Sequence, residues 1–99
     1  NDIIRRLGEY GIEPIVVDPW ASELDAVREY GVHLTELSEV IGADCVIVAV
    51  AHNEFRALGL NDIMRLYADI PDDEKVLLDV KGLYGMDELR SSGLSFWRL

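Results

Sequence analysis

Three features of this 99-residue sequence predict an α/β domain with a mostly parallel sheet and helices on both of its faces. Segments with helical and strand-like patterns alternate along the chain, with short connections between them. Glycine joins a helical segment to an apolar one in Tyr10-Gly11-Ile12 and again in Tyr30-Gly31-Val32. Residues Cys45 to Val50 are apolar throughout, as expected of a parallel strand that is covered on both faces.

The first 41 residues contain three segments of helical character and two of strand character. Apolar residues recur at helical spacing before Gly11, which ends the first helix. The next segment is rich in β-branched residues and closes at Asp18-Pro19, which favours a strand. Ser22 and Asp25 resemble a capping box at the start of the second helix. In order, the expected elements are a helix at 2–10, a strand at 12–17, a helix at 22–30, a short strand at 32–34 and a short helix or single turn at 35–41.

The rest of the chain continues the same alternation. Ile63, Leu66 and Tyr67 lie on one face of an amphipathic helix that Pro71 closes. Gly93 ends the last helix and leads into an apolar segment. The expected elements are a strand at 45–50, a helical turn at 52–58, a helix at 61–70, a strand at 75–80, a helix at 86–92 and a strand at 94–99.

Length, composition and charge exclude several classes of protein. The length fits one domain over residues 1–99. A net charge of −10 opposes nonspecific binding to nucleic acid or to anionic membranes, although one local cation can still attract a small anionic ligand. The longest uncharged apolar run, Cys45 to Ala51, is too short to span a membrane. One cysteine and no secretory leader favour a reduced, cytoplasmic location, and the start at Asn1 indicates a fragment or a processed product.

The carboxyl ends of the expected strands mark the edge where an open parallel sheet binds ligands. Asp18, Thr35, His52 and Lys81-Gly82 stand at this edge. We expect the strands at 45–50 and 75–80 to be parallel neighbours, so that His52 and Lys81 emerge on a shared rim.

Lys81 and Gly82 are the leading binding candidates. Lys81 is one of two lysines in the chain, and its ammonium suits a phosphate or a carboxylate. Gly82 allows a backbone to approach a ligand closely. The residues alone leave a second interpretation open, in which Lys81 pairs with Asp79 or Asp18 and has no further role.

Four other residues suggest chemistry, and for each the structural interpretation is favoured. His52 can act as a general base or as a donor to a ligand, but a histidine in this position more often caps its own turn. His33 and His52 lack a third ligand at metal spacing, so no metal site is expected. Asp18 resembles the acidic residue that holds an NAD ribose, but the Gly-rich turn that this role requires is absent. Cys45 is expected to be buried and inert. On this chemistry the sequence indicates a nucleotide-sized anion site and no reaction.

Several strings occur together in an order and spacing that resemble a known family. They are Val17-Asp18-Pro19, Glu29-Tyr30-Gly31-Val32, the run from Ala43 to Phe55, and Leu78-Asp79-Val80-Lys81-Gly82-Leu83-Tyr84. The set resembles the C-terminal domain of the UDP-glucose/GDP-mannose dehydrogenase family. The ending Ser95-Phe96-Trp97-Arg98-Leu99 and the variant Asp79-Val80-Lys81-Gly82 are most similar to the UDP-N-acetylhexosamine dehydrogenases of bacterial surface-polysaccharide synthesis.

The resemblance implies a Rossmann-like three-layer α/β/α fold from which the first strand of the family domain is missing. It implies that residues 1–99 are the UDP-binding part of an enzyme that oxidises the sugar C6 alcohol to a carboxylate with NAD, usually as a homo-oligomer. NAD and the catalytic cysteine would belong to other parts of that enzyme, since Cys45 does not match the cysteine, so this chain alone is expected to be non-catalytic. Lys81 occupies the place of a basic residue that contacts substrate in the family and is often arginine.

Two further expectations concern the edges of the sheet and the alternative function. The missing strand would leave strand edges unpaired, so we expect a rearranged strand order or a neighbouring chain to fill the gap. The alternative function is a free-standing Rossmann-like module for nucleotide binding or protein interaction. A response-regulator-like domain also fits the charge, but Asp18 is the one acidic residue found at the expected strand ends.

Overall fold

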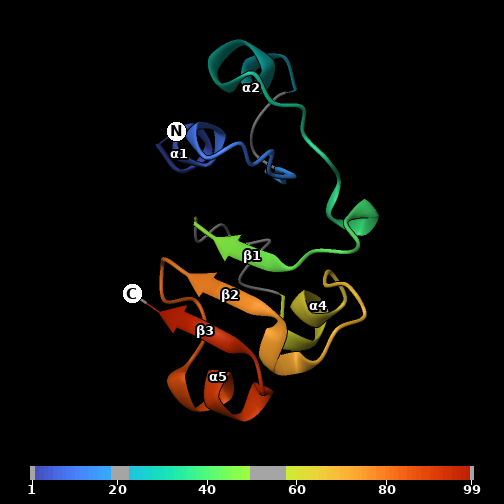
Figure 1. Ribbon diagram of the computed structural model, residues 1–99, viewed down its shortest axis with the longest axis vertical. Helices are drawn as coiled ribbons and strands as arrows, with labels where there is room; N and C mark the ends of the chain where they lie inside the picture. The colour runs from blue at the N-terminus through green and yellow to red at the C-terminus, as the bar shows by residue number, and fades with distance from the viewer. Residues whose placement is uncertain (1, 19–22, 50–57, 99) are drawn as a thin grey trace. The chain divides into compact units, whose positions relative to one another are not determined.

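The computed structural model of the chain describes residues 2–18, 23–49 and 58–98 (Figure 1). These residues belong to two compact units, Asn1–Val40 and Ile41–Leu99. The assignment of residues 1–99 to a single domain stays a prediction.

The first unit contains the three expected helical segments, and its expected strands are wrong in extent. Residues 12–17 and 32–34 meet at a single parallel bridge between Val16 and Leu34, where the Thr35 N–H donates to the Val16 carbonyl at 2.8 Å. Pro14 has no N–H to donate, so it cannot extend this pairing as a donor. The helical segments are α1 (Asp2–Glu9), α2 (Glu23–Tyr30) and the 3₁₀ helix η1 (Leu37–Glu39).

The second unit is built on a parallel sheet whose described strands have the order β1-β2-β3 (Figure 1). The register places Val48, Asp79 and Arg98 side by side at the carboxyl ends of the strands. Helical segments lie in both crossovers, which confirms the expected Rossmann-like α/β class. The elements are β1 (Cys45–Val48), α4 (Leu60–Met64), the 3₁₀ helix η2 (Asp72–Glu74), β2 (Val76–Asp79), α5 (Met86–Ser92) and β3 (Ser95–Arg98).

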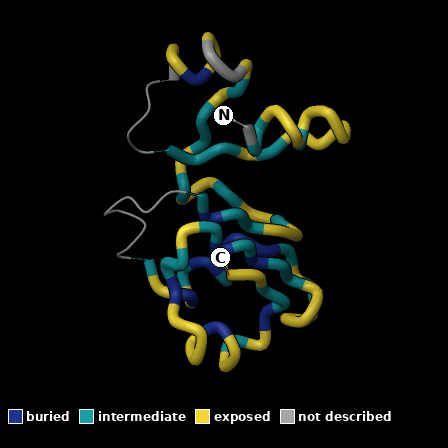
Figure 2. Tube along the Cα trace, turned by 90° about the vertical axis from the view of Figure 1, so that its left-hand side faces the viewer, coloured by how far each residue is buried: buried dark blue, intermediate teal, exposed yellow. Residues whose placement is uncertain are grey.

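The core of the second unit lies against one face of this sheet. Side chains alternate along β2, so that Leu77 and Asp79 are fully buried while Val76 and Leu78 are half-buried. Trp97 is the register partner of Leu78, so it lies on the same face as the half-buried residues, and it is 62% exposed. Figure 2 shows that most of the buried positions lie in this unit. Its buried apolar side chains are Val48, Leu60, Ile63, Leu66, Tyr67, Leu77, Tyr84, Leu89 and Leu94.

The helix expected at residues 61–70 is wrong in its second half, because α4 ends at Met64. Beyond it the backbone pairs with Ala43: the Ala43 N–H donates to the Leu66 carbonyl at 2.9 Å, and the Ala68 N–H donates to the Ala43 carbonyl at 2.8 Å. These groups are then unavailable for the helical ladder. Leu66 and Tyr67 are buried nonetheless, so the apolar pattern marked the core and not the helix.

Other expected elements of the second unit agree closely with the structure. The helix at 86–92 matches α5, and the strands at 75–80 and 94–99 contain β2 and β3. The end of the strand at 45–50 and nearly all of the turn at 52–58 lie outside the described residues. None of the helices in the described segments is long and apolar enough to cross a bilayer.

Candidate functional site

The loop between β2 and α5 folds around the carboxylate of Asp79. Asp79 ends β2 with no exposed surface, and its two oxygens accept the backbone N–H groups of Leu83 and Tyr84 at 2.8 Å each. A buried carboxylate is costly unless its oxygens are hydrogen-bonded, so these two bonds define the path of the loop. In the sequence, Lys81 and Gly82 lie between Asp79 and the two residues whose N–H groups its carboxylate accepts.

Arg98 holds the same loop from the neighbouring strand. It is the register partner of Asp79, and its Nε donates to the Tyr84 carbonyl at 2.8 Å. Its Nη2 donates to the Gly82 carbonyl at 3.4 Å. Gly82 adopts a φ of +66°, in the left-handed region that glycine enters at no steric cost. The loop is thus bonded through its N–H groups to one strand and through its carbonyls to the next.

Lys81 is exposed on this loop and, among the described residues, has no hydrogen-bond or ion-pair partner. The carboxylate of Asp79 is occupied by backbone N–H groups, so the interpretation in which Lys81 pairs with Asp79 is wrong. The ammonium of Lys81 is therefore available to an external anion.

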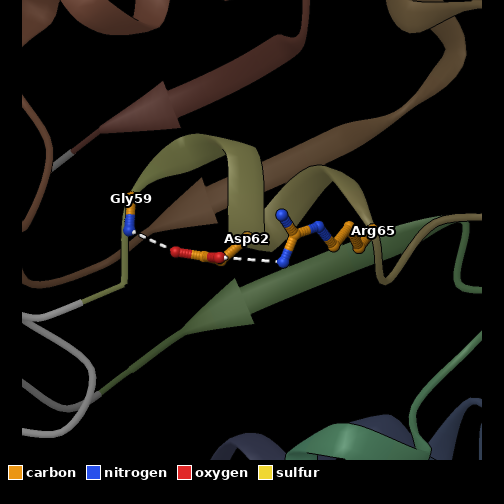
Figure 3. Close-up of polar contacts among 3 residues, drawn as sticks. All are labelled: Gly59, Asp62 and Arg65. Atoms are coloured by element: carbon orange, nitrogen blue, oxygen red, sulfur yellow. Dashed lines mark hydrogen bonds and ion pairs between the residues drawn. The ribbon is translucent and has the colours of Figure 1, made fainter.

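Among the described residues of the second unit, three other cations each pair with a nearby aspartate. Figure 3 shows one case, in which Asp62 accepts the Gly59 N–H at 3.0 Å and pairs with Arg65 at 3.2 Å. By contrast, Lys81 and Arg98 have no carboxylate partner within the described segments, and both lie at the loop after β2. The neutralised pairs are Arg65–Asp62, Lys75–Asp72 and Arg90–Asp87.

The structure brings together part of the set of residues predicted from the sequence. β1 and β2 are parallel neighbours, as expected, and the Val80 N–H donates to the Val48 carbonyl at 3.0 Å beyond the last paired residues. Lys81 and Gly82 follow directly at this end. His52 lies outside the described residues, and Asp18 is a half-buried residue of the first unit, so the shared rim remains a prediction.

Cys45 differs from its expected placement. It is exposed at the start of β1, on the sheet face opposite the core, so the prediction of a buried thiol is wrong. Partial desolvation and the neighbouring carboxylate of Asp44 raise the pKa of the thiol. A raised pKa reduces the thiolate fraction, which supports the expectation that this cysteine is unreactive.

Tyr84 carries a polar group that the loop leaves unbonded. The residue is 5% exposed, and its hydroxyl is buried with no hydrogen-bond partner among the described residues. Burial and the charges of Asp79, Glu88 and Asp62 raise the pKa of Tyr84 to about 12. The hydroxyl therefore stays protonated at neutral pH, with the cost of an unsatisfied buried donor.

We expect Tyr84→Phe to stabilise the chain by about 1 kcal/mol, because it removes that unsatisfied hydroxyl. Tyr67→Phe is the matched comparison, since the Tyr67 hydroxyl donates to the Val76 carbonyl at 2.6 Å. Losing that bond should destabilise the chain by about 1 kcal/mol. Urea unfolding of both variants measures the two effects, and a loss of stability in Tyr84→Phe would contradict the unbonded hydroxyl.

Sequence reasoning missed Asp79 and Arg98 as the residues that hold the loop, and it gave Tyr84 no individual role. The sequence does give one indication for Asp79: an acidic residue near the carboxyl end of an otherwise apolar strand needs a hydrogen-bond or ion-pair partner. No local signal marks Arg98, since its role depends on the pairing of β3 with β2.

The fold and this loop define a Rossmann-like α/β protein in which Lys81 after β2 and Arg98 at the end of β3 have no carboxylate partner among the described residues. The model of the UDP-glucose/GDP-mannose dehydrogenase family, UDP binding domain, matches residues 1–86. The chain belongs to this family, as the sequence motifs indicated.

Three curated relatives support the same assignment. A UDP-N-acetyl-D-glucosamine 6-dehydrogenase of Pseudomonas aeruginosa is 41% identical over 91% of this chain and 20% of its own length. A protein of the same name from Salmonella typhi is 35% identical over 81% of the chain and 18% of its own length. Protein CapL of Staphylococcus aureus is 31% identical over 98% of the chain and 22% of its own length. The chain thus spans about a fifth of the length of these curated relatives, and no solved structure matches it significantly.

Proposed function

We propose that this chain binds the UDP part of a nucleotide sugar, as one domain of an NAD-dependent UDP-sugar 6-dehydrogenase. The names of the relatives from Pseudomonas aeruginosa and Salmonella typhi make a UDP-N-acetylhexosamine the expected substrate. The parent enzyme would oxidise the C6 alcohol of the sugar to a carboxylate for polysaccharide synthesis. This domain contributes binding and orientation of the nucleotide and no reacting group.

The single observation that carries the proposal is the ammonium of Lys81, which has no partner among the described residues. The chain has a net charge of −10, and an unsatisfied cation on a bonded loop in such a chain favours an anionic ligand. The diphosphate of UDP carries negative charge, which would pair with the ammonium of Lys81. Gly82 beside it presents backbone without a side chain, which permits close approach of a phosphate.

The remaining expectations fit this proposal without being needed for it. NAD would be bound by another part of the parent enzyme, because the sequence of this chain has no Gly-rich dinucleotide turn. His52 and Asp18 stay candidate ligand-edge residues. A cytoplasmic location, a homo-oligomeric parent and the absence of a nucleic-acid, membrane or metal partner stay predictions.

We expect Lys81→Ala to weaken the binding of UDP to the parent dehydrogenase by about 10- to 100-fold, the usual value of a charge-assisted contact. Lys81→Arg should keep most of the affinity, since it preserves the charge and supplies two parallel donors. Isothermal titration with UDP, and with UDP-N-acetylglucosamine, measures both variants.

Lys75 is a matched control, because it is the other lysine of the chain and stands before β2, at the opposite end of the strand from Lys81. It pairs with Asp72 at 2.9 Å, and Lys75→Gln should leave UDP affinity unchanged. Equal affinity of the native protein and the Lys81→Ala variant would remove Lys81 from the site.

A further inference from the structure

Asp79 and Arg98 have opposite charges and are register partners on neighbouring strands, yet among the described residues they form no ion pair with each other. Each binds the backbone of the intervening loop instead. The carboxylate takes the N–H groups of Leu83 and Tyr84, both at 2.8 Å. The guanidinium takes the carbonyls of Tyr84, at 2.8 Å, and of Gly82, at 3.4 Å.

This arrangement fixes the backbone on one side of Lys81. Both polar backbone groups of Tyr84 are bonded, its N–H to Asp79 and its carbonyl to Arg98. The Gly82 carbonyl is bonded by Arg98, and the Gly82 N–H donates to the Asp79 carbonyl at 3.4 Å. Lys81 immediately precedes this bonded segment, so the start of its flexible side chain is fixed.

The shape of the Arg98 guanidinium suits it to bond two carbonyls of this loop at once. Two donors on one edge of its planar guanidinium reach two carbonyls of the loop together, which a lysine ammonium cannot reproduce. Bonding to carbonyls also leaves the charge of Arg98 without a carboxylate partner among the described residues. A second positive charge therefore stands at the loop that carries Lys81.

We propose that Arg98 is the positioning residue of the UDP site, holding the loop in the shape that presents Lys81 to the diphosphate. The inference rests on the proposed function, because it assigns Arg98 a role in the same site. It differs from a purely electrostatic role, in which any cation at this position would serve, and from a role in stability alone.

The test compares Arg98→Lys, Arg98→Gln, Lys81→Ala and the double variant Lys81→Ala/Arg98→Gln in the parent dehydrogenase, by isothermal titration with UDP. We expect both single Arg98 variants to bind UDP at least about tenfold more weakly, the lysine variant included, because the two-carbonyl bond is lost in each. Because Arg98 acts through Lys81, the double variant should bind within about twofold of Lys81→Ala alone. Arg90→Gln, on a guanidinium paired with Asp87 on α5, is the matched control and should bind as the native protein does.

Hydrogen–deuterium exchange provides a second measurement that does not depend on ligand binding. The amides of residues 82–84 should exchange faster in Arg98→Lys, while those of β2 keep the native rate if the fold is intact. Faster exchange throughout the second unit would assign Arg98 to stability alone and overturn the proposal.

The remaining outcomes separate the two proposals. Native UDP affinity in Arg98→Lys, or losses in the double variant that equal the product of the single losses, would overturn positioning by Arg98 and leave the UDP site in place. Native affinity in Lys81→Ala would overturn the proposed role of Lys81, and the role of Arg98 would fall with it.

Discussion

Replacing Asp79 by asparagine should destabilise the chain by about 3 kcal/mol, the value of charge-assisted hydrogen bonds lost in a buried site. The carboxylate has no exposed surface and accepts two N–H groups, and asparagine offers one acceptor and an amide that faces a donor. A domain of this size has about 5–15 kcal/mol of stability in total, so the loss is a large fraction. Urea unfolding followed by circular dichroism measures it.

Asp87→Asn is the control for this prediction, because Asp87 is fully exposed in the first turn of α5 and pairs loosely with Arg90 at 3.7 Å. That change should leave the free energy of unfolding close to the native value. Similar losses in the two variants would show that Asp79 does not hold the loop. A native stability in Asp79→Asn would show the same.

Leu77→Ala should cost about 2–5 kcal/mol, the range for removing a buried leucine and leaving a cavity. Leu77 has no exposed surface and lies in the middle of β2, between Val46 and Phe96 on the neighbouring strands. Collapse around the cavity is restricted, because hydrogen bonds fix the backbone of β2 on both sides.

Leu24→Ala provides the same chemical change at a side chain that is 60% exposed, and it should alter stability by less than about 0.5 kcal/mol. Denaturant unfolding of the two variants gives the comparison. A small effect of Leu77→Ala would contradict the packing of the core against β2.

The sequence was sufficient where one local pattern decided the structure. The helix at α5 ends at Gly93, whose φ of +83° is the left-handed cap that the sequence predicted. The apolar runs that contain β1 and β2 form parallel neighbouring strands. The ordered set of strings, the one around Lys81 among them, predicted the family, which the family model and the relatives confirmed.

Local patterns were insufficient where two distant segments compete for the same backbone groups. Tyr67 and its neighbours have the spacing of a helix, but Ala43 takes their hydrogen bonds and ends α4 early. Val16 and Leu34 meet at one bridge, although both lie in segments of high strand propensity.

Composition, apolar spacing and glycine positions thus indicated the α/β class, the order of most elements and the position of Lys81 after a strand. The loop geometry around Lys81 depends on Asp79 and Arg98, which become neighbours when β3 pairs with β2. The physical reason is the range of the forces: periodic burial and backbone preference act between near neighbours in sequence, whereas a buried charge is satisfied by whichever donors the folded chain brings to it.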